Sequence, residues 1–131
     1  MRLLLDTHIV LSVVNERTAE LPATLRAVLA DSQSEFYVSV ASLWEIAIKW
    51  RLGKLKLSGE LKLLPDILTS GGLELIAINE HHVLANVQPE PSTRDPFDRL
   101  LLAQCSVEEL FLVTVDRALV AHALAIRTEA R

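Results

Sequence analysis

The sequence contains one cysteine and few glycines, and each scarcity excludes a class of protein. Cys105 stands alone, so an internal disulfide is impossible and we expect a buried thiol. The glycines at positions 53, 59, 71 and 72 form no glycine-rich phosphate loop. No apolar run reaches the roughly 20 residues of a membrane-spanning helix, and the apolar start meets Asp6 too soon for a signal peptide. We therefore expect a soluble, cytoplasmic protein without membrane contact.

Positive charge is also scarce. The chain has 13 lysines and arginines against 17 aspartates and glutamates, for a net charge of −4. A general nucleic-acid binder is usually basic, so the charge argues against one. A nuclease is not excluded, because acids clustered in a site lower the count while bound metal ions offset them locally.

Apolar residues are abundant. They make up half of the 131 residues, and the mean hydropathy is +0.31. The length predicts a single domain, residues 1–131. Because this hydropathy is high for a small monomer, we expect part of the surface to be covered by a partner, and we predict a homodimer.

Short apolar segments alternate with helical patterns along the chain. The apolar segments predict strands at 3–5, 36–38, 73–78 and 111–115, with a last edge strand at 125–127. The helical patterns predict helices at 8–14, 22–30, 42–52, 60–70, 80–87 and 96–108. This alternation predicts an α/β fold in which a parallel sheet carries helices on both faces.

Four acids follow strand-like runs and stand at or near the starts of helices: Asp6, Glu45, Asp98 and Asp116. Parallel α/β sheets bind ligands beyond the carboxyl ends of their strands, so the fold would gather all four at one edge. Clustered carboxylates suit hard divalent cations, and such ions support phosphodiester chemistry. The pattern therefore predicts a metal-dependent nuclease.

Each acid also has a purely structural explanation. Asp6 and Asp116 could cap the helices that follow them. Glu45 could close a capping box that begins at Ser42, or it could pair with Lys49 one turn later. Asp98 could complement the dipole of a helix that begins after a capping Asp95.

Two features favour a metal site over these separate roles. Asp6 and Asp116 end short apolar strands, where their partly buried carboxylates would repel each other unless a cation lay between them. Asp98 opens a helix too apolar to lie on the surface. The four histidines show no zinc-ligand spacing, so the all-oxygen set favours Mg²⁺, with Mn²⁺ as a substitute.

At this point the chain resembles PIN-domain nucleases, and among them the VapC-type toxins of bacterial toxin–antitoxin pairs. Four fragments carry the resemblance: LLDTH at 4–8, SLWEI at 42–46, RDPFDRLL at 94–101 and LVTVD at 112–116. Their order and spacing make the set more specific than any one fragment. Residues 118–131 lack the aromatic residues that are common in this family.

The resemblance implies about five parallel strands in the order 3-2-1-4-5, with an acidic pocket for Mg²⁺ or Mn²⁺. It places the site acids on Asp6, Glu45, Asp98 and Asp116, and a supporting hydroxyl on Thr114. It further implies RNA as the substrate and a small antitoxin protein as a partner, with a helix of the antitoxin lying in an apolar groove. A non-catalytic PIN-like binding module and a DNA nuclease of the same fold are the alternatives.

We assign provisional roles on this basis. Asp6 is the expected principal metal ligand, Asp98 and Asp116 complete the coordination, and Glu45 orients the attacking water. Arg94 and Arg99 flank the site, either as solvated charges at a helix start or as contacts to phosphate. The densest basic stretch could follow the RNA backbone and consists of Lys49, Arg51, Lys54 and Lys56.

Overall fold

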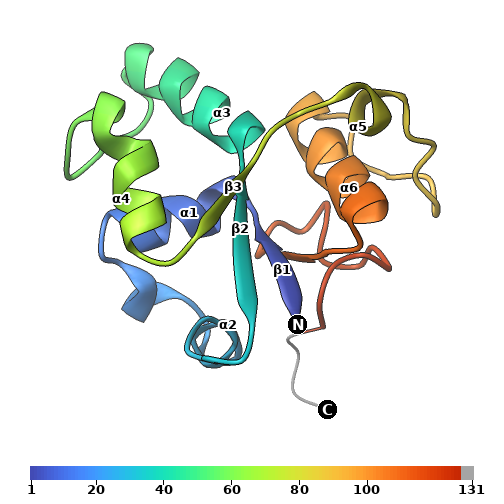
Figure 1. Ribbon diagram of the computed structural model, residues 1–131, viewed down its shortest axis with the longest axis horizontal. Helices are drawn as coiled ribbons and strands as arrows, with labels where there is room; N and C mark the ends of the chain where they lie inside the picture. The colour runs from blue at the N-terminus through green and yellow to red at the C-terminus, as the bar shows by residue number, and fades with distance from the viewer. Residues whose placement is uncertain (128–131) are drawn as a thin grey trace.

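The computed structural model describes residues 1–127 and contains one parallel sheet with helices on both faces (Figure 1). The strands are β1 (Arg2–Leu5), β2 (Glu35–Ser39), β3 (Glu74–Ile76) and β4 (Phe111–Val113). They lie in the order β3-β2-β1-β4, and every pairing is parallel. The α/β class and this order agree with the prediction, and β1 lies in the interior of the sheet.

The described residues form six α-helices and two 3₁₀ turns. They are α1 (Thr7–Val14), η1 (Thr18–Glu20), α2 (Ala23–Leu29), α3 (Val40–Arg51), η2 (Leu61–Leu63), α4 (Leu64–Ser70), α5 (Glu80–Leu84) and α6 (Pro96–Glu108).

The sheet has four strands, so the prediction of a fifth at 125–127 is wrong in its extent. Ala125 forms only an isolated parallel bridge with Leu112, outside β4. The chain before it is coiled by turns, because the Asp116 carbonyl accepts hydrogen bonds from the backbone N–H groups of Leu119 and Val120. Within the described residues, the chain after these turns therefore pairs with the sheet at this one position only. Residue 127 is the last one described.

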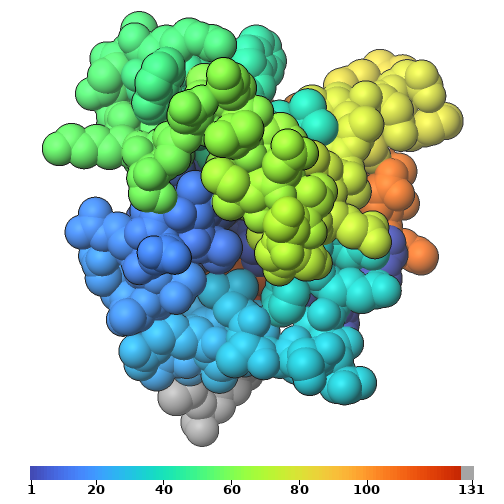
Figure 2. Space-filling model, turned by 60° about the vertical axis from the view of Figure 1, so that its left-hand side comes forward, coloured from blue at the N-terminus to red at the C-terminus, as the bar shows by residue number. Residues whose placement is uncertain are grey.

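Successive side chains of β1 point to opposite faces of the sheet and belong to two hydrophobic cores. Leu3 and Leu5 face the core that lies under α1, α2 and α4, whereas Leu4 faces the core under α6. Both cores are closed, since all three leucines are at most 1% exposed. Figure 2 shows the first face from outside, with α4 in yellow-green lying across its middle and the N-terminal segment in blue beside it.

Several helix starts differ from the predictions for identifiable reasons. The helix predicted at 42–52 begins at Val40, because the Ser39 side chain at the end of β2 already caps it by accepting a hydrogen bond from the backbone N–H of Ala41. The helix predicted at 60–70 is divided into η2 and α4, and Pro65 lies in the first turn of α4. Pro22 is the N-cap of α2 rather than its first residue.

Three elements are shorter than predicted. The strands expected at 73–78 and 111–115 are limited to Glu74–Ile76 and Phe111–Val113. The helix expected at 80–87 ends at Leu84, and Val87 is instead buried against the α6 core. Within the described residues, no helix is long and apolar enough to cross a membrane.

The connections at one edge of the sheet determine where the site lies. A single residue, Asp6, separates β1 from α1, and β2 runs directly into α3. At the same edge, α3 and α6 are joined by an edge-to-face contact between Trp44 and Phe97, with ring centroids 5.5 Å apart. Side chains from β1, α3 and α6 are thereby brought to one place.

Candidate metal centre

The four predicted acids line one pocket of about 290 Å³ at this edge. Asp6 comes from the end of β1, Glu45 from α3, Asp98 from α6, and Asp116 from the segment after β4. Asp95, which was predicted only as a helix cap, also lines the pocket. The fold thus brings together residues that are up to 110 positions apart in the sequence.

Asp6 is the most constrained of these acids. Its Oδ1 accepts a 2.7 Å hydrogen bond from the backbone N–H of Thr7, and its Oδ2 accepts a 2.6 Å hydrogen bond from the Thr114 hydroxyl. Burial raises the pKa of Asp6, and the charges of Asp116 and Glu45 raise it further. The carboxylate is therefore held in a fixed orientation in a place that disfavours its charge.

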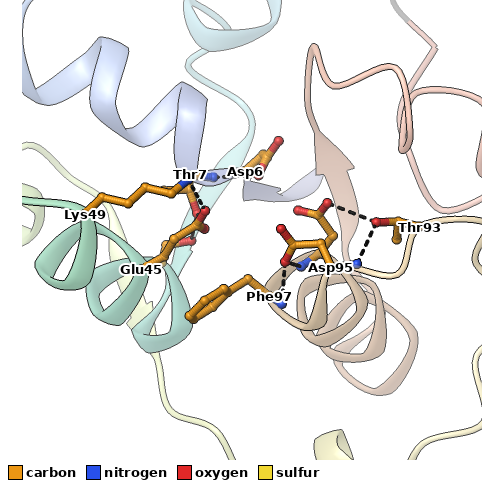
Figure 3. A network of polar contacts seen from close by, with 9 residues as sticks. Asp6, Thr7, Glu45, Lys49, Thr93, Asp95 and Phe97 are labelled. Carbon is orange, nitrogen blue, oxygen red and sulfur yellow. Dashed lines mark hydrogen bonds and ion pairs between the residues drawn. The ribbon is translucent and has the colours of Figure 1, made fainter. Parts of the chain in front are cut away.

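Glu45 is held from two sides (Figure 3). Its Oε1 accepts a 2.7 Å hydrogen bond from the Thr7 hydroxyl, and its Oε2 lies 2.7 Å from Nζ of Lys49. The predicted pairing with Lys49 is confirmed. The capping-box alternative is wrong, because Ser42 lies inside α3 rather than at its start.

Asp98 lies in the first turn of α6 and lines the same pocket as Asp6. Its Oδ2 accepts a 3.2 Å hydrogen bond from the Thr93 hydroxyl. Burial, and then the charge of Asp95, raise the pKa of Asp98 to about 7. Asp95 is the helix cap, as predicted, since its Oδ1 accepts hydrogen bonds from the backbone N–H groups of Phe97 and Asp98.

Asp116 stands at the exposed rim of the pocket. Its backbone N–H donates a 3.0 Å hydrogen bond to the Thr114 hydroxyl, and its Oδ1 accepts one from the backbone N–H of Ala118. The Thr114 hydroxyl therefore contacts both acids: it donates its proton to the Asp6 side chain, and its oxygen accepts the hydrogen bond from the backbone N–H of Asp116. It occupies the supporting position that the family resemblance implies.

The two arginines near the site differ in their surroundings. Arg99 donates hydrogen bonds to the carbonyl oxygens of Thr93, at 2.7 Å, and Pro91, at 3.0 Å, and it forms an ion pair with Glu90. Its guanidinium is held by the loop before α6, so a contact with phosphate, which stays a prediction, would have to replace one of these partners. Arg94 is exposed.

Sequence reasoning missed two hydroxyl residues. Thr7 contacts Glu45, and Thr93 contacts Asp98. Thr7 could have been found from its place directly after Asp6. Thr93 lies five residues before the acid that it contacts, in a loop without a regular period, so no sequence signal points to it.

The donor chemistry of the pocket fits a hard divalent cation. Asp6 and Asp98 supply oxygen donors, and burial, together with the neighbouring acids, raises the pKa of each, so a bound cation would stabilise their charged forms. The side chains of residues 1–127 as they stand include no group of three acids, histidines or cysteines positioned to hold an ion. The fit therefore rests on the type of donor.

Comparison with known proteins agrees with this architecture. The family model for the PIN domain matches residues 3–124. The chain belongs to the PIN-domain family. PIN domains are usually metal-dependent nucleases that use divalent ions, so membership supports a hydrolase. The search of curated proteins gives no match.

Proposed function

We propose that this PIN-domain protein is an endoribonuclease that depends on Mg²⁺ or Mn²⁺. One observation carries the proposal: five carboxylates from four separate parts of the chain line a single pocket at the carboxyl edge of the parallel sheet. Separate structural roles would not require the acids to share one pocket. Their shared position, together with the family, favours metal-assisted hydrolysis of phosphodiester bonds.

Each acid of the pocket would have its own role in the reaction. A bound divalent ion would polarise the phosphoryl group and lower the pKa of a water molecule. Asp6, fixed by Thr7 and Thr114, would be the principal ligand. Asp98 and Asp116 would complete the binding of the ion, and Glu45 would orient the attacking water.

A cleavage assay tests this function. The purified protein is incubated with single-stranded RNA and with DNA of the same sequence, in Mg²⁺, in Mn²⁺ and in excess EDTA. We expect RNA cleavage that stops in EDTA. Cleavage of DNA alone would identify a DNA nuclease, binding without cleavage would identify a non-catalytic module, and undiminished cleavage in EDTA would refute the metal mechanism.

We further propose that the protein is the toxin of a toxin–antitoxin pair and forms a homodimer. Exposed apolar side chains support a partner: Val40 and Trp44 of α3, and Leu52 at its C-cap, are 39%, 61% and 63% exposed. An apolar hollow of about 380 Å³ between α1, α2 and α4 could accept a helix of an antitoxin.

Two observations test the partners. A small antitoxin gene directly upstream, whose product co-purifies with this chain, would support the pair. Light scattering should give the mass of a dimer. A monomer at all concentrations without any co-purifying protein would count against both proposals.

A further inference from the structure

Lys49 is the one lysine or arginine that lines the pocket, within the described residues. Its Nζ lies 2.7 Å from Oε2 of Glu45, and its side chain is 48% exposed against 10% for that of Glu45. The ammonium group therefore stands between a buried carboxylate and solvent. Figure 3 shows Lys49 and Glu45 reaching from α3 towards Asp6 and Thr7.

The structure divides the carboxylates into two kinds. Glu45 has a cation on one oxygen and the Thr7 hydroxyl on the other. Asp6 and Asp98 have only hydroxyl and backbone partners among the described residues, and burial raises the pKa of each. Lys49 thus neutralises one member of the pocket and leaves the others for a different cation.

A phosphodiester that enters this pocket meets an unfavourable charge. Five carboxylates and one ammonium group line it, and a single divalent ion would offset only part of the excess. A further positive charge beside the pocket would therefore favour the binding of the phosphate. Lysine suits this task, because its flexible stem carries three N–H donors and Lys49 uses them on one partner in the structure.

We propose that Lys49 is an exchangeable cation of the site, which holds Glu45 in the substrate-free protein and moves to a phosphate oxygen when a divalent ion and nucleic acid bind. This inference rests on the proposed function. It makes Lys49 a competitor of the metal for Glu45 and a ligand of the substrate. Removal of its charge should therefore strengthen metal binding and weaken nucleic-acid binding.

The experiment compares Lys49→Gln and Lys49→Arg with Arg26→Gln, which removes one positive charge from an exposed position on α2, outside the pocket and outside the basic stretch. Calorimetry measures Mn²⁺ binding to the metal-free proteins. Fluorescence anisotropy measures the binding of a short labelled RNA in Ca²⁺. Melting temperatures in EDTA establish that each variant is folded.

We expect Lys49→Gln to bind Mn²⁺ several-fold to about tenfold more tightly than wild type, since a repelling charge is gone. It should bind RNA about tenfold more weakly, with a salt slope reduced by about 0.7, while Lys49→Arg restores RNA binding. Arg26→Gln should change both the Mn²⁺ affinity and the RNA affinity less than twofold. Unchanged Mn²⁺ affinity of Lys49→Gln, or RNA binding by Lys49→Gln equal to that of Arg26→Gln, would overturn the exchange.

Both measurements report binding and need no turnover. If wild type cleaves nothing but the two affinities shift in opposite directions as expected, the proposed function fails and the role of Lys49 stands. If wild type cleaves RNA and the affinities do not shift, the function stands and the role of Lys49 fails.

Discussion

The Thr114 hydroxyl donates a 2.6 Å hydrogen bond to Oδ2 of Asp6 and so joins the ends of the neighbouring strands β4 and β1 across 108 positions of sequence. Both side chains are buried, at 4% and 5% exposed. The orientation of the central acid of the pocket therefore depends on a residue from the far end of the domain.

Replacement of Thr114 by valine tests that dependence. Thr114→Val keeps the shape and removes the hydroxyl, so Asp6 loses a donor and the backbone N–H of Asp116 loses an acceptor. We expect a loss of about 1–3 kcal/mol in the free energy of unfolding and weaker Mn²⁺ binding. Urea denaturation and calorimetry measure both, and Thr114→Ser should recover most of each. A valine variant that binds Mn²⁺ like wild type would contradict the supporting role.

Substitution of Asp6 separates a metal site from a helix cap. Asp6→Asn removes a charge from a place where burial and neighbouring acids raise the pKa. We expect cleavage to fall at least about 100-fold, a loss of about 2.7 kcal/mol in transition-state stabilisation, while the metal-free protein melts at the same temperature or higher. Asp66→Asn, in an exposed part of α4, is the control and should change neither quantity. An active Asp6→Asn protein would refute the site.

The stability of the metal-free protein should depend on pH through Asp98. The pKa of Asp98 is about 7 in the folded chain against its ordinary value of 3.8, so the folded state binds more protons than the unfolded state between these limits. The free energy of unfolding should therefore fall as pH rises from about 4 to 7, by an amount on the order of a few kcal/mol. Melting in EDTA measures it, and the fall should be smaller in Asp98→Asn. Equal slopes would show that Asp98 is not the group responsible.

Arg99 should act as a structural clamp for the loop before α6. Arg99→Met removes the hydrogen bonds to the carbonyl oxygens of Thr93 and Pro91, and so loosens the residue that contacts Asp98. We expect a loss of about 1–3 kcal/mol in stability and faster hydrogen exchange at 90–95. Arg94→Met, at an exposed neighbour, is the matched control. Identical exchange in the two variants would contradict the clamp.

The sequence pattern was sufficient to predict the α/β class and the acids that share the pocket, whereas the strand order came from the resemblance to PIN domains. The first two depend on a regular pattern: apolar strands alternate with helices, and the acids follow the strands. Asp6 and Asp98 were therefore placed correctly without knowledge of their neighbours. The helix start at Val40 was missed because Ser39 and Ser42 both offer a capping side chain, and only the end of β2 selects the first.

The contacts that hold the acids could not be predicted in the same way. Thr93 reaches Asp98 through a loop whose shape is set by Arg99, and such loop geometry has no sequence period. The prediction of the last strand was wrong for a similar reason, since the turns at 116–124 determine where Ala125 meets the sheet. Local patterns predict elements, whereas these contacts depend on tertiary structure.

The link between Thr114 and Asp6 also has a consequence for the newly made protein. Contacts between residues so far apart form late, because the loop between them must close first. A chain that is still being synthesised has Asp6 long before it has Thr114 and Asp116, which follow 108 and 110 positions later. Under the proposed ribonuclease function, this order would delay the formation of the cutting site until the ribosome has read the codons of all these residues.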